Sequence, residues 1–349
     1  MRAIKLVKPK KYQVIEYSDP IRDDDNVIID VERIGMSDID ISVWSGSKVY
    51  GFGQVVGNSF CGIVTDRGDR EDICLGDRVI ILPLNYCGEC DFCKKNMENL
   101  CNEIITKGIP GISVDGACAE KYCSSSNHLF NVDSDVSPGV AALAVPIAIG
   151  HHTSITVGRI QEREKVLVVG TGGMYDLFTA WWAKQQGAFV VLATNTKNGW
   201  DYFNDIGFGD EIINLLEKDA VENVRESISM GFDYVIDCNI ESNNIFNEVC
   251  IPLVRKGGKI IQVGKREGRY NLNLFGFHSK ELSLLSSHGY SKSDFEMAVE
   301  AIKMNYREFE NYIKGIEVVS MEQAQKKMLE LAQGKLKIPL FQIDPRKND

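Results

Sequence analysis

The stretch Asn85–Asn102 reads NYCGECDFCKKNMENLCN. Its cysteines follow the spacing C-x-x-C-x-x-C-x7-C and are Cys87, Cys90, Cys93 and Cys101. Thiolates this close in sequence can surround one ion tetrahedrally, which is the geometry of closed structural zinc sites. Gly88 allows the chain to bend between the first two ligands. The spacing therefore predicts one structural zinc per chain, and a reduced surface loop or two disulfides are the alternatives.

The composition is typical of a globular protein that acts on small molecules. The 349 residues are 44% hydrophobic and 25% charged, enough for about two domains. The net charge of −10 and the lack of a Lys/Arg cluster argue against a nucleic-acid partner. No apolar run approaches the ~20 residues of a membrane span. The start, MRAIKLVKPKK, has Lys and Pro where a signal peptide is apolar, and the remaining cysteines are scattered. We therefore expect a cytoplasmic protein without a membrane partner.

Short strand-like runs separated by polar turns fill the first third of the chain. The expected strands are Ala3–Val7, Tyr12–Tyr17, Val27–Ile34, Ser59–Val64, Arg78–Leu82, Ala117–Cys123 and Leu129–Val132. They predict a small, barrel-like β unit with the cysteine lobe inserted in it.

From Ser137 the pattern changes. Ser137-Pro138 opens an apolar helix that runs to about Val157, and Pro146 is expected to break or kink it. Strands and helices then alternate, which predicts a parallel, doubly wound sheet and an α/β fold. The expected strands are Lys165–Val169, Ala188–Ala193, Phe232–Asp237 and Lys259–Val263, with a helix at Gly173–Gln186. Two amphipathic helices, Ser293–Met304 and Met321–Gln333, and the strand Lys337–Ile343 form a tail that should return to the first unit.

A glycine-rich turn lies between the first strand and the first helix of this alternating region. Residues 165–176 read KVLVVGTGGMYD. Glycines here allow a tight turn and let the backbone approach a pyrophosphate at the helix N-terminus. The third glycine of G-x-G-x-x-G is replaced by Tyr175, so a structural turn without a ligand is the alternative. The predicted dinucleotide-binding residues are Gly170, Thr171, Gly172, Gly173, Met174 and, after a later strand, Gly264.

The end of the next strand bears on the choice of cofactor. It reads Thr194-Asn195-Thr196-Lys197, without the Asp or Glu that usually binds the ribose 2′-hydroxyl of NAD. Thr194 and Asn195 can hydrogen-bond a 2′-phosphate, and Lys197 can supply positive charge. We therefore expect NADP(H) rather than NAD(H), with a polar turn that tolerates either cofactor as the alternative.

These motifs together resemble the zinc-type medium-chain dehydrogenase/reductase family, which contains alcohol, polyol and threonine dehydrogenases. The resemblance covers nearly the whole chain. It rests on the cysteine lobe, the glycine turn, DGACAEKY at 115–122, FDYVID at 232–237 and GGK at 257–259. It implies a GroES-like catalytic domain at 1–147 with a structural zinc lobe at 85–105. A Rossmann nucleotide-binding domain at 148–290 and a returning C-terminal segment at 291–349 would follow. It further implies an active site between the domains, and a homodimer or homotetramer.

The chain departs from the family at the catalytic zinc. The family's G-x-C-x-x-D motif has Ser37 at its cysteine position, and the proton-relay position is Ile39. The G-H-E motif appears as Gly57-Asn58-Ser59, and a later acidic position is Val145. Neutral Ser and Asn are poor zinc ligands. The resemblance therefore predicts a member without catalytic zinc, unless Asp38, Cys61 or His152 supplies ligands.

Without a metal, charge on the substrate oxygen must be met by hydrogen bonds or by a proton donor. The candidate catalytic residues are Ser37, Asn58, Asp38 and His152, with Tyr50 as a further donor. Polar filling of a vacated metal pocket is the alternative for Ser37 and Asn58. Three functions stay open: hydride transfer to an activated C=C or C=N bond, sugar or polyol carbonyl/alcohol exchange, and a non-enzymatic nucleotide-binding protein.

Overall fold

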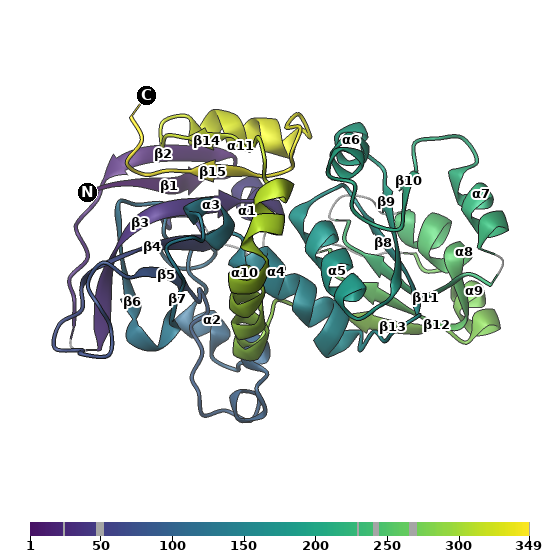
Figure 1. The fold of residues 1–349 in the computed structure, drawn as a ribbon, viewed down its shortest axis with the longest axis horizontal. Coiled ribbons are helices and arrows are strands. Elements are labelled where there is room, and N and C mark those ends of the chain that lie inside the picture. The colour runs from purple at the N-terminus through teal and green to yellow at the C-terminus, as the bar shows by residue number, and fades with distance from the viewer. Residues whose placement is uncertain (24, 47–51, 229, 240–243, 265–270, 349) are drawn as a thin grey trace. The chain divides into compact units, whose positions relative to one another are not determined.

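A computed structural model describes residues 1–23, 25–46, 52–228, 230–239, 244–264 and 271–348, so the candidate Tyr50 lies outside the described residues. The chain divides into two compact units (Figure 1). The first unit is Met1–Ala148 with Tyr290–Asp349, and the second is Ile149–Gly289. None of the described helices combines the length and the apolar character that a membrane crossing requires.

The first unit is built on a seven-stranded, mostly antiparallel sheet. Its order is β14-β15-β3-β4-β5-β7, with β6 also paired to β3, while β1 and β2 form a separate hairpin. The strands are β1 (Arg2–Lys8), β2 (Lys11–Glu16), β3 (Asn26–Met36), β4 (Ser59–Asp66), β5 (Arg78–Ile81), β6 (Lys121–Ser125), β7 (Leu129–Asn131), β14 (Val318–Val319) and β15 (Phe341–Ile343). Alternate apolar residues of β3, including Val27, Ile29 and Val31, enter the core.

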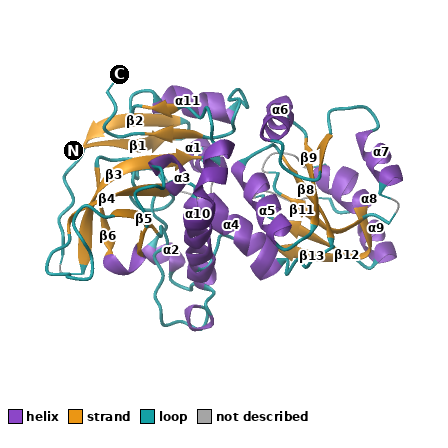
Figure 2. Cartoon of the chain, in the orientation of Figure 1, coloured by secondary structure: helices purple, strands orange, loops and turns teal. Residues whose placement is uncertain are grey.

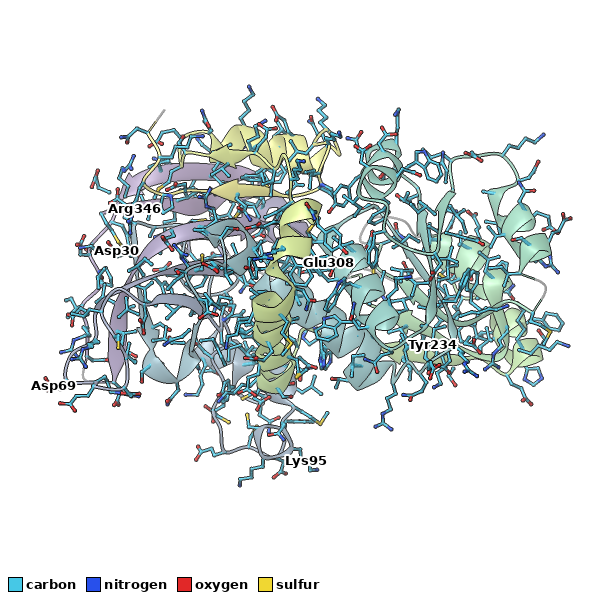
Figure 3. The ribbon with its side chains drawn as sticks, viewed as in Figure 1. Asp30, Asp69, Lys95, Tyr234, Glu308 and Arg346 are labelled. Carbon is cyan, nitrogen blue, oxygen red and sulfur yellow. The ribbon has the colours of Figure 1, made fainter. Side chains whose placement is uncertain are left out.

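The C-terminal tail completes this sheet, as predicted. In β15, Phe341 pairs with Met36 of β3, and beyond it Arg346 forms an ion pair of 3.1 Å with Asp30 (Figure 3). Helices α10 (Lys292–Tyr312) and α11 (Ala324–Ala332) belong to the same unit. The first of them runs past the predicted end at Met304, through a kink at Asn305, because Phe309 and Tyr312 continue its buried face.

The apolar helix predicted from Ser137 is three consecutive pieces. They are α3 (Pro138–Ala141), α4 (Ala144–His151) and a π-helix at His152–Val157. The prediction that Pro146 breaks the helix is wrong. Pro146 lies in the first turn of α4, where a backbone amide would have no intrahelical partner. The interruption falls instead between α3 and α4.

Two predicted strands are shorter than expected. β6 begins at Lys121, because the amide of Ala119 donates to the carbonyl of Ala117 at 2.7 Å in a tight turn. β15 begins at Phe341, after a similar turn between Leu340 and Ile338. Each turn diverts the chain before regular pairing starts.

The second unit is a parallel six-stranded sheet of order β10-β9-β8-β11-β12-β13. Its strands are β8 (Lys165–Gly170), β9 (Phe189–Thr194), β10 (Glu211–Asn214), β11 (Phe232–Asp237), β12 (Val254–Gln262) and β13 (Ser283–Ser286). Helices cover both faces (Figure 2), and they include α5 (Met174–Gln185), α6 (Lys197–Ile206), α7 (Ala220–Ser227), α8 (Ile251–Leu253) and α9 (Leu274–Lys280). This order confirms the predicted Rossmann sheet. Its strand order reverses between β8 and β11, where such sheets bind ligands at their carboxyl ends.

Gly150 provides a test of packing in the second unit. A β-carbon at Gly150 would lie 2.5 Å from the carbonyl carbon of Phe178 in α5. The backbone of Phe178 cannot change rotamer to make room, as a side chain can. Gly150→Ala should therefore lower the free energy of unfolding by about 1–3 kcal/mol. Chemical denaturation of the purified variant measures this loss.

Gly139→Ala in α3 is the matched control. An added methyl there would meet side-chain atoms and no backbone: the ends of Gln342 and Ile313, at 3.1 and 3.2 Å, and Ser137 Oγ at 3.8 Å. Since alanine also favours helix, the control should be close to neutral. Equal losses in both variants would contradict the packing argument.

Candidate metal and nucleotide sites

The four lobe cysteines converge on one point. Their Sγ atoms all lie within 4.8 Å of one another, and Cys90 and Cys93 have sulfurs 3.5 Å apart. These separations exceed the ~2.05 Å of a disulfide, and all the cysteines are free. Among the described residues, no other group of three or more His, Cys, Asp or Glu side chains could hold one ion. The arrangement fits a tetrahedral zinc.

Backbone amides surround the sulfurs. The amides of Cys87 and Glu103 each donate to Cys101 Sγ at 3.4 Å, and such donors stabilise a thiolate. Backbone hydrogen bonds lower the pKa of Cys90 to about 6. Burial raises the pKa of Cys93, and the positive charge of a bound metal ion would favour its thiolate.

The lobe is tied to a long helix of its own unit. The buried carboxylate of Glu98 accepts a hydrogen bond of 3.1 Å from the amide of Lys292, the first residue of α10. A carboxylate at a helix N-terminus is favoured by the helix dipole. The metal lobe therefore supports the tail segment that completes the sheet.

Ser37 and Asn58, two of the candidate catalytic residues, follow β3 and precede β4 in the first unit. Gly35 at the end of β3 pairs with Ser59 at the start of β4. This register brings Ser37 and Asn58 to the same end of the sheet, where they are 4% and 2% exposed. A shared catalytic role for Ser37 and Asn58 stays a prediction.

Asn58 and Ser59 bond to the chain's own backbone. Asn58 Nδ2 donates to the carbonyl of Pro110 at 2.7 Å. Ser59 Oγ donates to the carbonyl of Ala142 at 2.7 Å and accepts from the amide of Val145 at 3.3 Å. Ser59 therefore joins the end of α3 to the start of α4. Both side chains are neutral and hold segments of the chain together.

Ser37, Asp38 and Asp40 form the start of α1 (Asp38–Ser45). The amide of Ser37 donates to Asp40 Oδ2 at 2.9 Å, so Asp40 caps the helix. Burial raises the pKa of Asp40 to about 7; the negative charge of Asp38 adds to this, and the amide of Ser37 opposes it. Asp38 is the acidic group next to Ser37 in sequence, and it is buried.

His152 and Cys61, the other candidates, lie in different units. Cys61 is buried within β4, and its Sγ donates to the carbonyl of Pro138 at 3.4 Å. His152 is buried at the start of the π-helix in the second unit. Its neighbour His151 packs edge-on against Trp182, with ring centroids 4.6 Å apart. A catalytic role for His152 stays a prediction.

The glycine turn follows β8 at the carboxyl end of the sheet. Gly172 has a φ of +92°, which favours glycine, and an added β-carbon would lie 2.2 Å from the Cα of Gly199. The hydroxyl of Thr196 donates to the carbonyl of Thr171 at 2.6 Å. The end of β9 therefore lies against the turn, as a dinucleotide site requires.

Asp176 is the feature that sequence reasoning missed. Its Oδ2 accepts hydrogen bonds from the amides of Gly172 and Gly173, at 2.7 and 3.0 Å. The side chain packs against Gly170, where a β-carbon would lie 2.0 Å from the same oxygen. An acidic residue three positions after the helix N-cap is a capping signal, and Asp176 has this spacing from Gly173.

Gly264 lies at the same sheet edge. An added β-carbon there would be 2.0 Å from the carbonyl oxygen of Asn239. Asn239, in turn, donates through Nδ2 to the carbonyl of Val169 in β8 at 3.2 Å. The carboxyl ends of β8, β11 and β12 are therefore linked by polar contacts that the sequence did not indicate.

The residues expected to select the cofactor differ in environment. Asn195 Oδ1 is covered and has no hydrogen-bond partner within the described residues. Lys197 forms an exposed ion pair with Asp201, one turn along α6. The charge of Lys197 is therefore partly offset.

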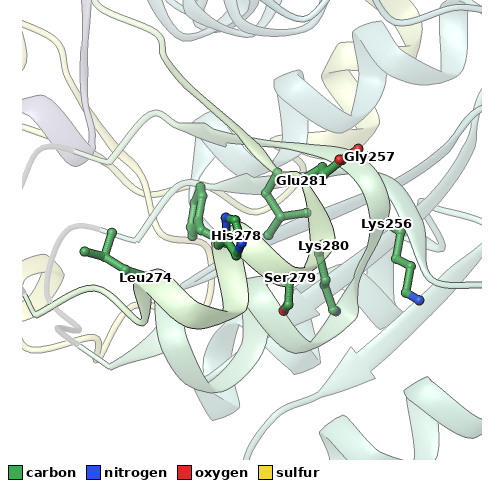
Figure 4. Close-up of a pocket in the computed structure, with 9 residues that line it drawn as sticks. Lys256, Gly257, Leu274, His278, Ser279, Lys280 and Glu281 are labelled. Carbon is green, nitrogen blue, oxygen red and sulfur yellow. The ribbon is translucent and has the colours of Figure 1, made fainter.

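Figure 4 shows a surface hollow at the opposite edge of the same sheet. Lys256, Gly257, His278 and Ser279 contribute to its lining. Lys280 also lines it, and its Nζ donates to backbone carbonyls, among them that of Ile251 at 2.7 Å. Because it adjoins the amino ends of β12 and β13, the hollow is separate from the glycine turn.

Comparisons with known proteins agree with this architecture. The profile of the family "Alcohol dehydrogenase GroES-like domain" matches residues 23–134, and that of "Zinc-binding dehydrogenase" matches residues 177–304. L-galactonate-5-dehydrogenase of Escherichia coli K12 is 26% identical, over 84% of this chain and 85% of its own. D-arabitol-phosphate dehydrogenase of Enterococcus avium is 28% identical, over 82% of each chain.

Solved structures show the same fold. A zinc-binding dehydrogenase of Sinorhizobium meliloti 1021, bound to NADP, superposes with a TM-score of 0.84 at 21% identity, covering 99% of each chain. A protein of E. coli CFT073 named as a short chain alcohol dehydrogenase, complexed with NADH, superposes with a TM-score of 0.85 at 19% identity. The superposition also covers 99% of each chain. The two units and the cysteine lobe define a dehydrogenase architecture. The chain belongs to the medium-chain dehydrogenase/reductase family and is an NAD(P)-dependent oxidoreductase of that type.

The cysteine cluster provides the second test. Cys93→Ser should reduce the zinc content from about one per chain to near zero, and the thermal unfolding temperature should fall, because structural zinc contributes folding energy. Elemental analysis and calorimetry measure the two effects. Cys74→Ser, at an exposed cysteine outside the cluster, should change neither. Zinc retained at one per chain in Cys93→Ser would contradict the ligand assignment.

Asp40 provides a test by pH. The pKa of the Asp40 carboxyl is 3.8 in the unfolded chain and is raised to about 7 in the folded protein. The folded state therefore binds more protons between these values, and stability falls as pH rises through the interval. This loss is on the order of 4 kcal/mol at most. Asp40→Asn removes the titration. The unfolding midpoint should fall less between pH 5 and pH 8 in the variant than in the wild type. Equal falls in the two proteins would contradict the prediction.

Proposed function

We propose that this chain is a nicotinamide-dependent dehydrogenase of small sugar or polyol substrates, with one structural zinc and no catalytic zinc. The observation that supports the lack of a catalytic zinc is the hydrogen bonding of Asn58 and Ser59. Their side chains are neutral, and they hold Pro110 and Ala142 instead of offering thiolate, imidazole or carboxylate ligands. The substrate class rests on the names of the related galactonate and arabitol-phosphate dehydrogenases.

In such a reaction the nicotinamide exchanges a hydride with the substrate carbon. The proton on the substrate oxygen must then be moved by a side chain. We assign the hydrogen bond to this oxygen to Ser37, and the proton acceptor to Asp38 next to it. Asn58 donates one of its two amide hydrogens to Pro110, and Oδ1 is the part that can accept from a substrate hydroxyl. His152 is the alternative donor.

For the cofactor, we propose NADP(H) in preference to NAD(H), bound at the glycine turn. Residues 194–197 contain no carboxylate that would repel a 2′-phosphate, and the covered Asn195 Oδ1 has no hydrogen-bond partner among the described residues. The ion pair of Lys197 with Asp201 reduces the positive charge available there. We also propose a homo-oligomer, because β13 is an edge strand of the sheet and Leu284 on it is 47% exposed.

A non-enzymatic nucleotide-binding protein is the second candidate. Ile39 favours it, because an apolar side chain occupies the position at which the family's proton relay has a hydroxyl. An activated C=C or C=N substrate would equally dispense with the metal.

The deciding experiment combines metal analysis, cofactor titration and turnover. We expect about one zinc per chain, binding of NADPH more tightly than NADH, and oxidation of a polyol or sugar acid. Two zinc ions per chain would overturn the proposed lack of a catalytic metal. Binding without turnover of any alcohol, carbonyl or enone would favour the second candidate.

Ser37→Ala tests the assigned residue. It should lower kcat/KM by about 10²-fold while leaving the cofactor dissociation constant unchanged, since positioned proton transfer contributes about that much. Ser45→Ala is the matched control: Ser45 is exposed at the other end of α1 and donates to the carbonyl of Ser42. An unchanged kcat/KM in Ser37→Ala would remove Ser37 from the reaction.

A further inference from the structure

Asp176, in the first turn of α5, folds back over the glycine turn. Its Oδ2 accepts from the amides of Gly172 and Gly173 at 2.7 and 3.0 Å. The side chain is 3% exposed, and its carboxylate fills the space beside Gly170 that a β-carbon would need. The carboxylate is thus a built-in part of the turn.

The amides bound by Asp176 belong to the turn that would receive a dinucleotide. In doubly wound sheets, pyrophosphate binds backbone amides at this turn and the helix N-terminus behind it. A carboxylate has the same negative sign, accepts the same hydrogen bonds and is favoured by the same helix dipole. A pyrophosphate approaching Gly172 and Gly173 would meet donors already in use and a like charge beside them.

The same spacing in two other helices shows what is specific to α5. Asp40 accepts from the amide of Ser37, and Asp294 accepts from the amide of Ser291 at 2.8 Å. Both of those helices begin with a serine N-cap. In α5 the N-cap is Gly173, which has no side chain, and Asp176 binds two successive amides of the turn.

We propose that Asp176 is an internal competitor of the dinucleotide: its carboxylate occupies the pyrophosphate-binding amides in the free protein and must be displaced before NADPH or NADH binds. The inference rests on the proposed nicotinamide function. It makes one side chain of the second unit the determinant of cofactor affinity. It also distinguishes the turn of this chain from one whose amides are free to receive phosphate.

Asp176→Asn is the test, because it keeps the size of the side chain and an acceptor oxygen while removing the charge. Fluorescence titration should show NADPH and NADH binding at least about tenfold more tightly than to the wild-type chain, since a like charge at close range is removed. Inorganic pyrophosphate should raise the unfolding temperature of the variant more than that of the wild type.

Asp294→Asn is the matched control, because it removes a capping carboxylate of the same spacing from α10 in the other unit. It should leave both dissociation constants unchanged. If Asp176→Asn does not fold, as judged by circular dichroism, Asp176→Ser retains a hydroxyl acceptor for the amides.

The outcomes separate the two proposals. Dissociation constants that are equal or weaker in the folded Asp176 variant would show that the carboxylate is only a helix cap, and would leave the proposed dehydrogenase intact if the wild type binds cofactor. No binding of NADPH or NADH by either protein would overturn this inference and the proposed cofactor together.

Discussion

The pairing of β3 with its neighbours organises the first unit. This strand of eleven residues pairs with β4, β6 and β15, so it joins the early chain to the last strand. Close approach to β4 requires Gly62, where a β-carbon would lie 2.3 Å from the carbonyl of Asp30. The same register places Gly35 opposite Ser59, and so places Ser37 and Asn58 at one end of the sheet.

The cysteine lobe and Ser59 hold their surroundings in different ways. The cysteine lobe brings four sulfurs within 4.8 Å of one another and is joined through Glu98 to α10. Ser59 joins the end of α3 to the start of α4 through two hydrogen bonds. Under the proposed function, these ordinary hydrogen bonds stabilise the segment without providing a Lewis acid.

Local patterns predicted most of the architecture and the cysteine cluster. Alternating apolar residues located β3, and spacing alone identified Cys87 to Cys101. The predictions that were wrong or missing concern residues whose structure depends on contacts with distant parts of the chain or on where a neighbouring element ends. Pro146 was expected to interrupt a helix, but a break after Ala141 placed it in a new first turn, where proline is tolerated. Contacts such as Asn58 with Pro110 join segments that are far apart in sequence, and no local pattern reports them.

Asp176 shows how a residue can satisfy one local rule and obstruct another. As a cap it stabilises the start of α5, because it satisfies two amides that a glycine N-cap leaves open. As an anion it uses the donors that make a glycine turn a phosphate site. A sequence motif records only that the turn can form, whereas the hydrogen bonds show what occupies it. Where stability and ligand binding draw on the same few amides, a gain in one is a cost to the other.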